Sequence, residues 1–424
     1  MTMTGRSNGL PSDGAWDSTL ALLREGYDFI PRRCRRLHSD VFTTRLMLRR
    51  AVCISGRDAV AQFYVPGRFT RRGAMPTTTL TLLQDRGSVQ TLDGEAHRQR
   101  KRLFLGLMSP QSIQRLVALA DARWQARIRG WEARGGDIVL LDEVREILCG
   151  AACDWAGVPL GEGELEERTR EFAAMIDGSG TAGPRNWRGQ LLRRRSERWI
   201  RGLVEEVRQG RLSVPADSAL QAVASHRDAD GSPLPAKVAA VELINLLRPT
   251  VAVALYIVFA AHALHRNPEW RERLAGGSDA ELEAFTQEVR RLYPFFPMIG
   301  GRVLQPFEWR GHRFEEGDWV LADLHGTNHD PRLWPDPEAF RPERFLPPEP
   351  PDENALVPQG GGDVRAGHRC PGEWITIALV KGALRQLCGA MRYEVPPQDL
   401  TIDLSRMPAP PQSGFILRNV RQGA

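Results

Sequence analysis

One cysteine, Cys370, lies in the segment that most constrains how this chain can fold. The segment reads PQGGGDVRAGHRCPG over residues 358–372, so a glycine-rich loop precedes the cysteine and Pro371 follows it. The apolar residues that come next recur at helical spacing: Ile377, Val380, Leu384 and Leu387. Because proline suits the first position of a helix, we predict that a helix begins at Pro371. The helix dipole and unbonded N–H groups would then favour a thiolate at Cys370.

A thiolate in a glycine-rich loop suits either a nucleophile or a soft metal ligand. A nucleophile needs a base, and His368 is only two residues away, but nearness in sequence is not catalytic geometry. Haem iron accepts a single protein thiolate, because the porphyrin fills four of its positions. Gly360, Gly361 and Gly362 would let the loop lie close to the flat macrocycle, and His368 and Arg369 would meet its propionate groups. We therefore favour Cys370 as the axial ligand of a haem iron.

Two other groups of charged residues are spaced for pairing. Glu288 and Arg291 are three residues apart on one face of a predicted helix and can form an ion pair. Arg344, in the segment PERF, offers a second guanidinium to the same carboxylate. His97 and Lys101 lie one helical turn apart in EAHRQRKRLF and form a cationic pair suited to a propionate.

The pattern along the chain indicates one large, mostly helical unit. Residues from about 110 to 291 read as successive helices, and Ser278 with Glu281 forms the capping-box pattern that begins the last of them. Short strands with turn signals follow. Since no break in composition separates a second unit, we predict a single domain over residues 1–424, mainly α with a small β component.

Composition excludes several function classes. Lys and Arg total 57 against 52 Asp and Glu, and a net charge of +5 is too mild to indicate a nucleic-acid partner. The longest apolar stretch, Pro249 to Ala261, is far shorter than the roughly 20 residues of a membrane span. The six cysteines form no framework and no export signal is visible, so we expect a cytoplasmic protein with reduced thiols.

Together these features resemble the cytochrome P450 superfamily over nearly the whole chain. The sequence from Glu288 to Arg291 matches its E-x-x-R helix motif, Arg344 matches the loop that completes that triad, and Cys370 matches the axial thiolate. His97 and Lys101 match the propionate-facing pair. The resemblance implies a helical prism around a buried haem b.

Two departures resemble one branch of that superfamily, the bacterial fatty-acid peroxygenases. Asp363 stands where the usual haem loop has phenylalanine, because DVRA lengthens the loop. Arg248 and Pro249 stand where the usual oxygen-activating helix has an acid–threonine pair. The stretches GTNHDPRLWPDPEAFRPERF and MPAPPQSGF are also similar to that branch.

The resemblance implies that Arg248 binds a fatty-acid carboxylate above the haem. A guanidinium matches a carboxylate with two parallel hydrogen bonds, and Pro249 would interrupt the helix and shape the pocket. The carboxylate would act as general acid–base for hydrogen peroxide, and no redox partner would be required. The alternative from the residue alone is that Arg248 caps a helix or reaches solvent.

Other residues are candidates for lining the substrate pocket. Gln90 matches the position near the alpha and beta carbons of the substrate, and glutamine there points to hydroxylation with some decarboxylation to terminal alkenes. A loop hydrogen bond is the alternative role for Gln90. Ala252, Phe295 and Met298 are apolar candidates for the same pocket, and a plain core role is the alternative for them.

Two other functions stay open at this point. One is a monooxygenase that receives electrons from a redox partner, which the missing acid–threonine pair disfavours. The other is a non-catalytic haem-thiolate protein for binding or sensing, in which the arginine at position 248 is unnecessary.

Overall fold

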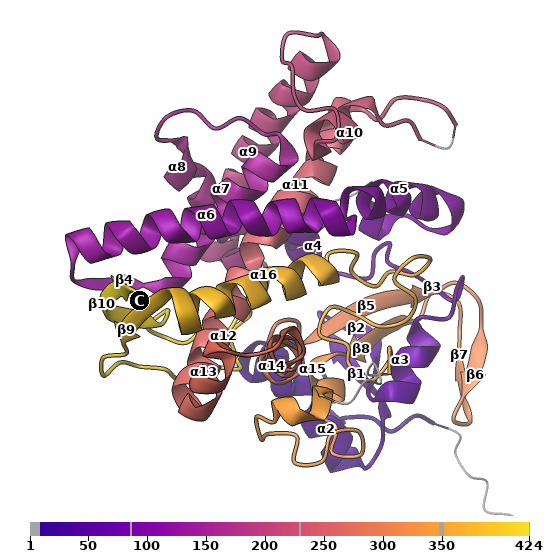
Figure 1. Ribbon diagram of the computed structural model, residues 1–424. Coiled ribbons are helices and arrows are strands. Elements are labelled where there is room, and N and C mark those ends of the chain that lie inside the picture. The colour runs from indigo at the N-terminus through magenta and orange to yellow at the C-terminus, as the bar shows by residue number, and fades with distance from the viewer. Residues whose placement is uncertain (1–8, 85–86, 229, 347–351, 424) are drawn as a thin grey trace, which may run out of the picture.

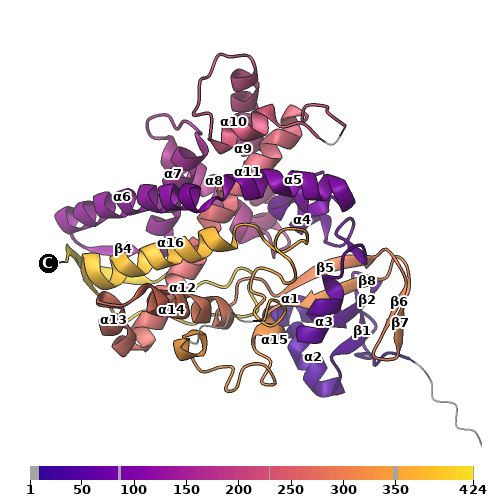
Figure 2. The ribbon, with the colours of Figure 1, turned by 45° about the vertical axis from the view of Figure 1, so that its right-hand side comes forward.

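The structure, a computed structural model, describes residues 9–84, 87–228, 230–346 and 352–423. Most helices gather in one part of the molecule, and the largest sheet lies in another with the N-terminal helices (Figure 1). The same separation is seen after the turn of Figure 2. The predicted class, mainly α with a small β component, is confirmed.

The helices of at least seven residues are α1 (Thr19–Glu25), α2 (Phe29–Leu37), α3 (Arg57–Phe63), α4 (Thr77–Leu83), α5 (Gly94–Leu107), α6 (Pro110–Arg134), α7 (Leu140–Ala156), α8 (Glu164–Gly178), α9 (Pro184–Arg208), α10 (Ala219–Ser225), α11 (Ala236–Ala252), α12 (Ala254–Arg266), α13 (Pro268–Ala275), α14 (Asp279–Leu292) and α16 (Glu373–Arg385). Shorter helical turns are η1 (Gly26–Asp28), η2 (Val89–Thr91), α15 (His325–Asn328), η3 (Pro342–Phe345) and η4 (Gln386–Ala390). The strands are β1 (Val41–Leu46), β2 (Arg49–Ile54), β3 (Phe69–Thr70), β4 (Asp137–Val139), β5 (Met298–Val303), β6 (Phe307–Trp309), β7 (His312–Phe314), β8 (Trp319–Asp323), β9 (Met391–Glu394) and β10 (Ile416–Gln422).

The largest sheet has five strands in the order β1-β2-β8-β5-β3. β1 and β2 form a hairpin whose turn residues, Met47 and Leu48, both take positive φ angles, as a tight hairpin turn requires. β8 pairs parallel with β2 and antiparallel with β5. Every residue of β8 is buried, which fits its central place in the sheet.

The helices α11 and α12 form a nearly continuous rod through the molecular core. Pro249 has no N–H for the carbonyl four residues earlier, and the rod is interrupted shortly afterwards, where the N–H of Val253 bonds the Thr250 carbonyl at 3.2 Å. The stretch Ala236–Arg266 has the length and composition of a membrane span, but 89% of its most apolar window is buried inside the protein. This stretch is longer than the apolar run from Pro249 to Ala261 noted in the sequence. Because it is buried, it serves as a core helix.

Two predicted helix starts have different outcomes. The capping box of α14 is confirmed, because the Ser278 hydroxyl accepts from the Glu281 N–H and the Glu281 carboxylate accepts from the Ser278 N–H. The predicted start of α16 at Pro371 is wrong. The residues after Cys370 form a turn, Gly372 is the N-cap, and the helix begins at Glu373.

Candidate active site

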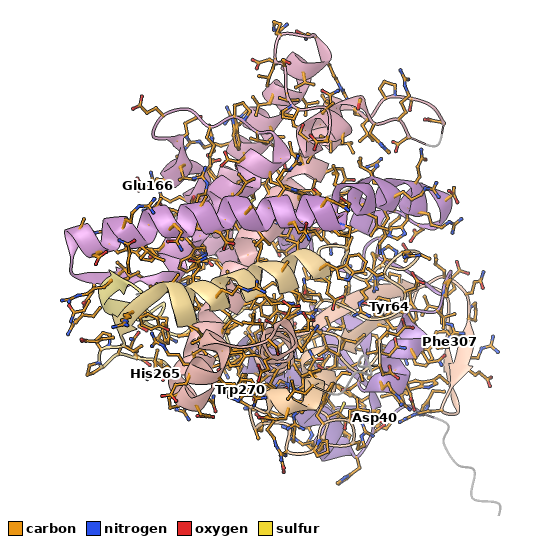
Figure 3. All side chains as sticks on the ribbon, viewed as in Figure 1. Asp40, Tyr64, Glu166, His265, Trp270 and Phe307 are labelled. Atoms are coloured by element: carbon orange, nitrogen blue, oxygen red, sulfur yellow. The ribbon has the colours of Figure 1, made fainter. Side chains whose placement is uncertain are left out.

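The loop that carries Cys370 packs tightly against the end of α3. A Cβ on Gly361 would lie 2.6 Å from Val60, and one on Gly362 would lie 2.6 Å from the Cβ of Tyr64. Tyr64 follows directly after α3, beside the sheet (Figure 3). Close packing on α3 thus accounts for both glycines, and their contact with a cofactor stays a prediction.

The Cys370 thiol lies in an environment that opposes its ionisation. Burial raises the pKa of the thiol, although the N–H of Gly372 and the charges of Lys101 and Arg290 act in the opposite direction. The N–H contribution expected at the start of the helix is therefore present, but burial outweighs it in the metal-free thiol. A metal ion that binds a thiol deprotonates it outright, so this site suits a ligand better than a nucleophile.

Four basic side chains meet beside this loop, two of them histidines whose pKa is lowered by burial. The rings of His97 and His368 lie with their centres 4.0 Å apart and are tilted by 33° to each other. Lys101, one turn after His97 on α5, donates to the carbonyl of Arg369 at 2.8 Å. Arg71, which follows β3, is buried and lies close enough to both histidines to lower their pKa values. The structure therefore brings together His97, Lys101 and His368 and adds Arg71. Arg369, the fourth residue predicted to meet propionates, is instead paired with Glu373 at 2.7 Å.

The two cations of this group, Arg71 and Lys101, feel the charges of Asp93 and Asp363 but form no ion pair with these carboxylates. Burial, with the neighbouring Lys101 and Arg71 charges, lowers the pKa of His97 to about 4. Burial likewise lowers the pKa of Lys101 to about 8. Within the described parts of the chain, no carboxylate is hydrogen-bonded to Arg71, His97, Lys101 or His368. A cysteine thiol beside such a cluster fits haem, whose iron takes the sulfur and whose two propionates supply the missing negative charge.

The predicted Glu288 group is assembled as expected. Arg291 donates to both carboxylate oxygens of Glu288, at 2.7 and 2.8 Å, and both side chains are fully buried. The Arg344 Nε lies 3.5 Å from Glu288 Oε1, an ion-pair distance. The backbone N–H of Arg341 also donates to Glu288, at 2.8 Å. This group ties α14 to the segment that contains η3.

Arg248 is a buried cation on α11 that is 5% exposed. Its Nη2 donates to the carbonyl of Leu83 at 2.6 Å and to Oδ1 of Asn245 at 3.4 Å, while its buried Nε has no partner. Burial, with the nearby charge of Arg193, lowers the pKa of Arg248 to about 9. Among the residues described, no carboxylate pairs with it. Of the two alternative roles, reaching solvent is therefore wrong, whereas capping a helix is confirmed, because Leu83 is the last residue of α4.

Asn245 links the two predicted catalytic residues. Its Nδ2 donates to Oε1 of Gln90 at 3.3 Å, and its Oδ1 accepts from Arg248. Gln90 lies on η2 and is partly buried. It does make a hydrogen bond, but to the helix that carries Arg248 rather than within its own loop.

The η2 segment is anchored by a buried ion pair. Glu242 accepts from Arg100 at 2.6 Å and from the N–H of Val89 at 2.8 Å. Burial raises the pKa of Glu242, and the Arg100 charge works against that rise. Glu242 thus fixes the residue next to Gln90: its Oε1 accepts both of these bonds, and its Oε2 accepts from Asn245 at 3.4 Å.

The remaining predicted pocket residues lie near this region but have core contacts. The ring of Phe295 stacks on that of Tyr256 with 4.3 Å between ring centres. Met298 packs on the apolar cluster between α2 and the sheet. Ala252 is partly buried one turn after Arg248, and Pro249 directly follows Arg248 in the same helix. Contact of these four residues with a substrate stays a prediction.

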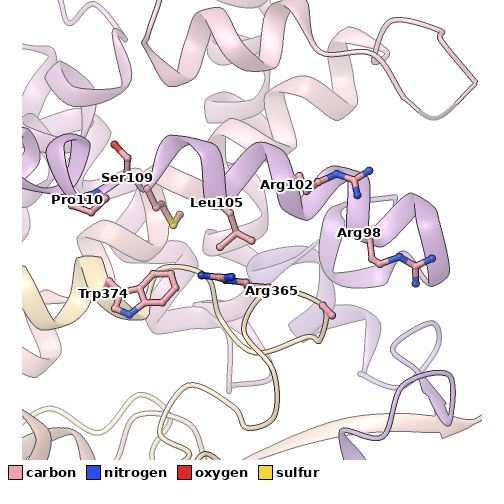
Figure 4. A pocket seen from close by; sticks show the side chains of 9 residues that line it. Arg98, Arg102, Leu105, Ser109, Pro110, Arg365 and Trp374 are labelled. Atoms are coloured by element: carbon pink, nitrogen blue, oxygen red, sulfur yellow. The ribbon is translucent and has the colours of Figure 1, made fainter. Parts of the chain in front are cut away.

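A separate open pocket of about 520 Å³ lies on the surface beside the cysteine loop (Figure 4). Its lining residues are Arg98, Arg102, Leu105, Met108, Ser109, Pro110, Arg365, Ala366 and Trp374. None of the predicted substrate-binding residues is among them, so this is not the predicted substrate pocket.

Sequence reasoning missed Arg71, Arg100, Glu242, Asn245 and Gln359. Of these, Gln359 and Arg100 had a local signal, because they lie in the glycine-rich segment and in EAHRQRKRLF, both already singled out. The others are joined to the site across long stretches of chain, such as the 142 residues between Arg100 and Glu242.

Comparison with known proteins decides the family. The family model for cytochrome P450 matches residues 281–413. A solved structure of a cytochrome P450SP alpha (CYP152B1) variant is 47% identical, has a TM-score of 0.93, and is matched over 96% of this chain and 100% of its own. This chain belongs to the cytochrome P450 family. Within it, the chain falls in the CYP152 branch, the fatty-acid peroxygenases that the sequence resembles.

Two further CYP152-type structures are similar over almost their full length. Cytochrome P450EX alpha (CYP152N1) with myristic acid is 40% identical, with a TM-score of 0.93 over 97% of this P450 and 99% of that chain. A variant of cytochrome P450 OleT in complex with arachidonic acid is 32% identical, with a TM-score of 0.94 over 98% and 99%.

Proposed function

We propose that this P450 hydroxylates long-chain fatty acids at the alpha or beta carbon with hydrogen peroxide, with some decarboxylation to terminal alkenes. It would act as a single haem-thiolate domain over residues 1–424, in the cytoplasm and without a redox partner. Two of the similar structures contain the fatty acids myristic acid and arachidonic acid. This supports a carboxylate-bearing chain as the substrate class.

The observation that carries this proposal is the buried guanidinium of Arg248 without an acidic partner. A buried charge is costly unless it is paired, and burial has already lowered the pKa of Arg248 to about 9. Its Nε is buried and unbonded. A substrate carboxylate would accept from that N–H and supply the missing negative charge.

The protein's own groups on α11 are not available for proton transfer. The Thr250 hydroxyl donates to the Leu246 carbonyl at 2.8 Å. The Glu242 carboxylate is bonded by Arg100 and by the backbone of Val89. With both groups engaged, the bound carboxylate would serve as the general acid–base for peroxide.

Haem b, held by Cys370 and by the basic cluster of Arg71, His97, Lys101 and His368, would supply the activation of peroxide for oxidation of the alkyl chain. Arg248 would fix the carboxylate, so the alpha and beta carbons would be the nearest to the reacting centre. Asn245 would hold Gln90 toward those carbons. Regioselectivity would then follow from position rather than from carbon reactivity.

Product formation from myristic acid and hydrogen peroxide, with no redox protein present, tests the proposal. We expect hydroxylated acid from the wild type and a roughly hundredfold or greater loss in Arg248→Ala, since removing one member of a buried charge pair costs about 2–5 kcal/mol. Arg248→Lys keeps the charge without the planar fork and should lie between them.

The carbon monoxide difference spectrum is the control for haem loading in each variant. A normal thiolate signature with no peroxide-driven product in the wild type would refute the proposal. Product only with oxygen, a ferredoxin and its reductase would favour the redox-partner alternative. Full activity in Arg248→Ala would refute the proposed binding of the substrate carboxylate by Arg248.

A further inference from the structure

The side chain of Gln359 is aimed at the sulfur of Cys370. Its Nε2 is 4.0 Å from Cys370 Sγ and donates to the Thr376 hydroxyl at 3.1 Å. The backbone carbonyl of Gln359 also accepts from the Cys370 N–H at 3.2 Å. The same residue therefore meets the cysteine through both its main chain and its side chain.

A buried cation fixes the orientation of this amide. Arg290 Nη2 donates to Gln359 Oε1 at 3.1 Å and also to the Glu373 carboxylate, and Arg290 is 1% exposed. Since a guanidinium can only donate, the amide oxygen must face Arg290 and the amide nitrogen must face the sulfur. The cation also polarises the amide, which makes its N–H groups stronger donors.

The neighbouring ion pairs fix the position of the Arg290 side chain. Glu373 accepts from Arg369 at 2.7 Å as well as from Arg290. Thr376, on the first turns of α16, donates its own hydroxyl to the Gly372 carbonyl at 3.1 Å. The Gln359 amide thus uses its oxygen for Arg290 and one N–H for Thr376, and its second N–H is left for the sulfur.

We propose that Gln359 is a positioning residue that tunes the thiolate, because its amide N–H draws negative charge from the Cys370 sulfur. This inference rests on the proposed role of Cys370 as the axial ligand. Hydrogen bonds to ligand sulfurs set the potential and bond strength of thiolate-bound iron. Removal of this donor leaves more charge on the sulfur, which strengthens the iron–sulfur bond and stabilises the ferric form.

The test compares three haem-loaded variants by spectroelectrochemistry and resonance Raman spectroscopy. Gln359→Leu removes the donor, and Gln359→Glu keeps the shape and the acceptor for Arg290 while it replaces the N–H groups by oxygen. Thr376→Val is the matched control, since it removes the other partner of the same amide. For both Gln359 variants we expect the ferrous-to-ferric ratio at a fixed potential to fall about tenfold, equivalent to ~59 mV for one electron. The iron–sulfur stretching frequency should rise, and Thr376→Val should change the ratio less than twofold.

Each outcome decides the matter. An unchanged potential in haem-loaded Gln359→Leu overturns the inference. Because Gln359→Glu also adds a negative charge that lowers the potential by itself, its iron–sulfur stretching frequency decides if Gln359→Leu does not retain haem: an unchanged frequency overturns the inference. Loss of haem from both variants, with haem retained in Thr376→Val, would assign Gln359 a purely structural role and also overturn it. Absence of the thiolate signature in the wild type would instead defeat the assignment of Cys370, on which the proposed function depends.

Discussion

The two sides of the candidate site treat buried charge in opposite ways. Behind the cysteine loop, the buried arginines are paired: Arg291 binds Glu288 with two hydrogen bonds, and Arg290 binds Glu373. On α11, Arg248 is also buried, yet it bonds only a carbonyl and an amide oxygen.

The difference separates charges that hold the fold from charges that wait for a ligand. A buried ion pair links elements and is complete without any other molecule. A buried cation without an acid is expensive, so its presence indicates that an anion completes it. Arg71 and Lys101 belong with Arg248 in this respect, and haem propionates would complete them as a substrate carboxylate would complete Arg248.

The largest effect on folding should come from breaking the paired side. Glu288→Gln leaves Arg291 charged and buried without its carboxylate, so we expect a loss of about 3–5 kcal/mol in the free energy of unfolding. Denaturant titration of the haem-loaded protein measures it. The matched control is Glu95→Gln. It removes the ion pair between Glu95 and Arg98, which has the same i,i+3 spacing and a distance of 2.7 Å but lies on the exposed face of α5. Equal losses in the two variants would contradict the distinction.

A smaller effect should follow from a change in the basic cluster. Lys101→Ala removes one predicted propionate partner, and a hydrogen bond to a charged group contributes about 1.5–3 kcal/mol. We therefore expect haem to transfer to apomyoglobin roughly ten- to a hundredfold faster, with little change in unfolding of the haem-free chain. Arg102→Ala, on the exposed side of the same helix, should transfer haem at the wild-type rate. Similar rates for both variants would remove Lys101 from the haem site.

Local patterns made much of the site predictable. The E-x-x-R spacing placed Glu288 and Arg291 together because neighbouring turns of one helix fix that distance. The spacing of His97 and Lys101 likewise placed both side chains on one face of a helix, one turn apart. The start of α16 was misplaced because proline is compatible with a turn as well as with a first helical position. The conformation of the surrounding loop determines that Pro371 lies in a turn.

Contacts between distant segments could not be read from the sequence. Asn245 and Gln90 are 155 residues apart, and Gln359 and Arg290 are 69 apart. Which face of α11 meets η2 depends on the packing of the whole core, and no periodicity in either segment specifies it. The sequence also gave no sign that burial would outweigh the helix N-terminus at Cys370.

The most direct test of the central claim compares the affinities of a fatty acid and its methyl ester for the wild type and for Arg248→Leu. Titrations followed by the substrate-induced change in the haem spectrum give the four dissociation constants. Since the ester is neutral, the account predicts that the wild type binds the acid roughly a hundredfold more tightly than the ester and that Arg248→Leu binds the two equally. A preference for the acid that survives in Arg248→Leu would show that another group binds the carboxylate, and would contradict the account.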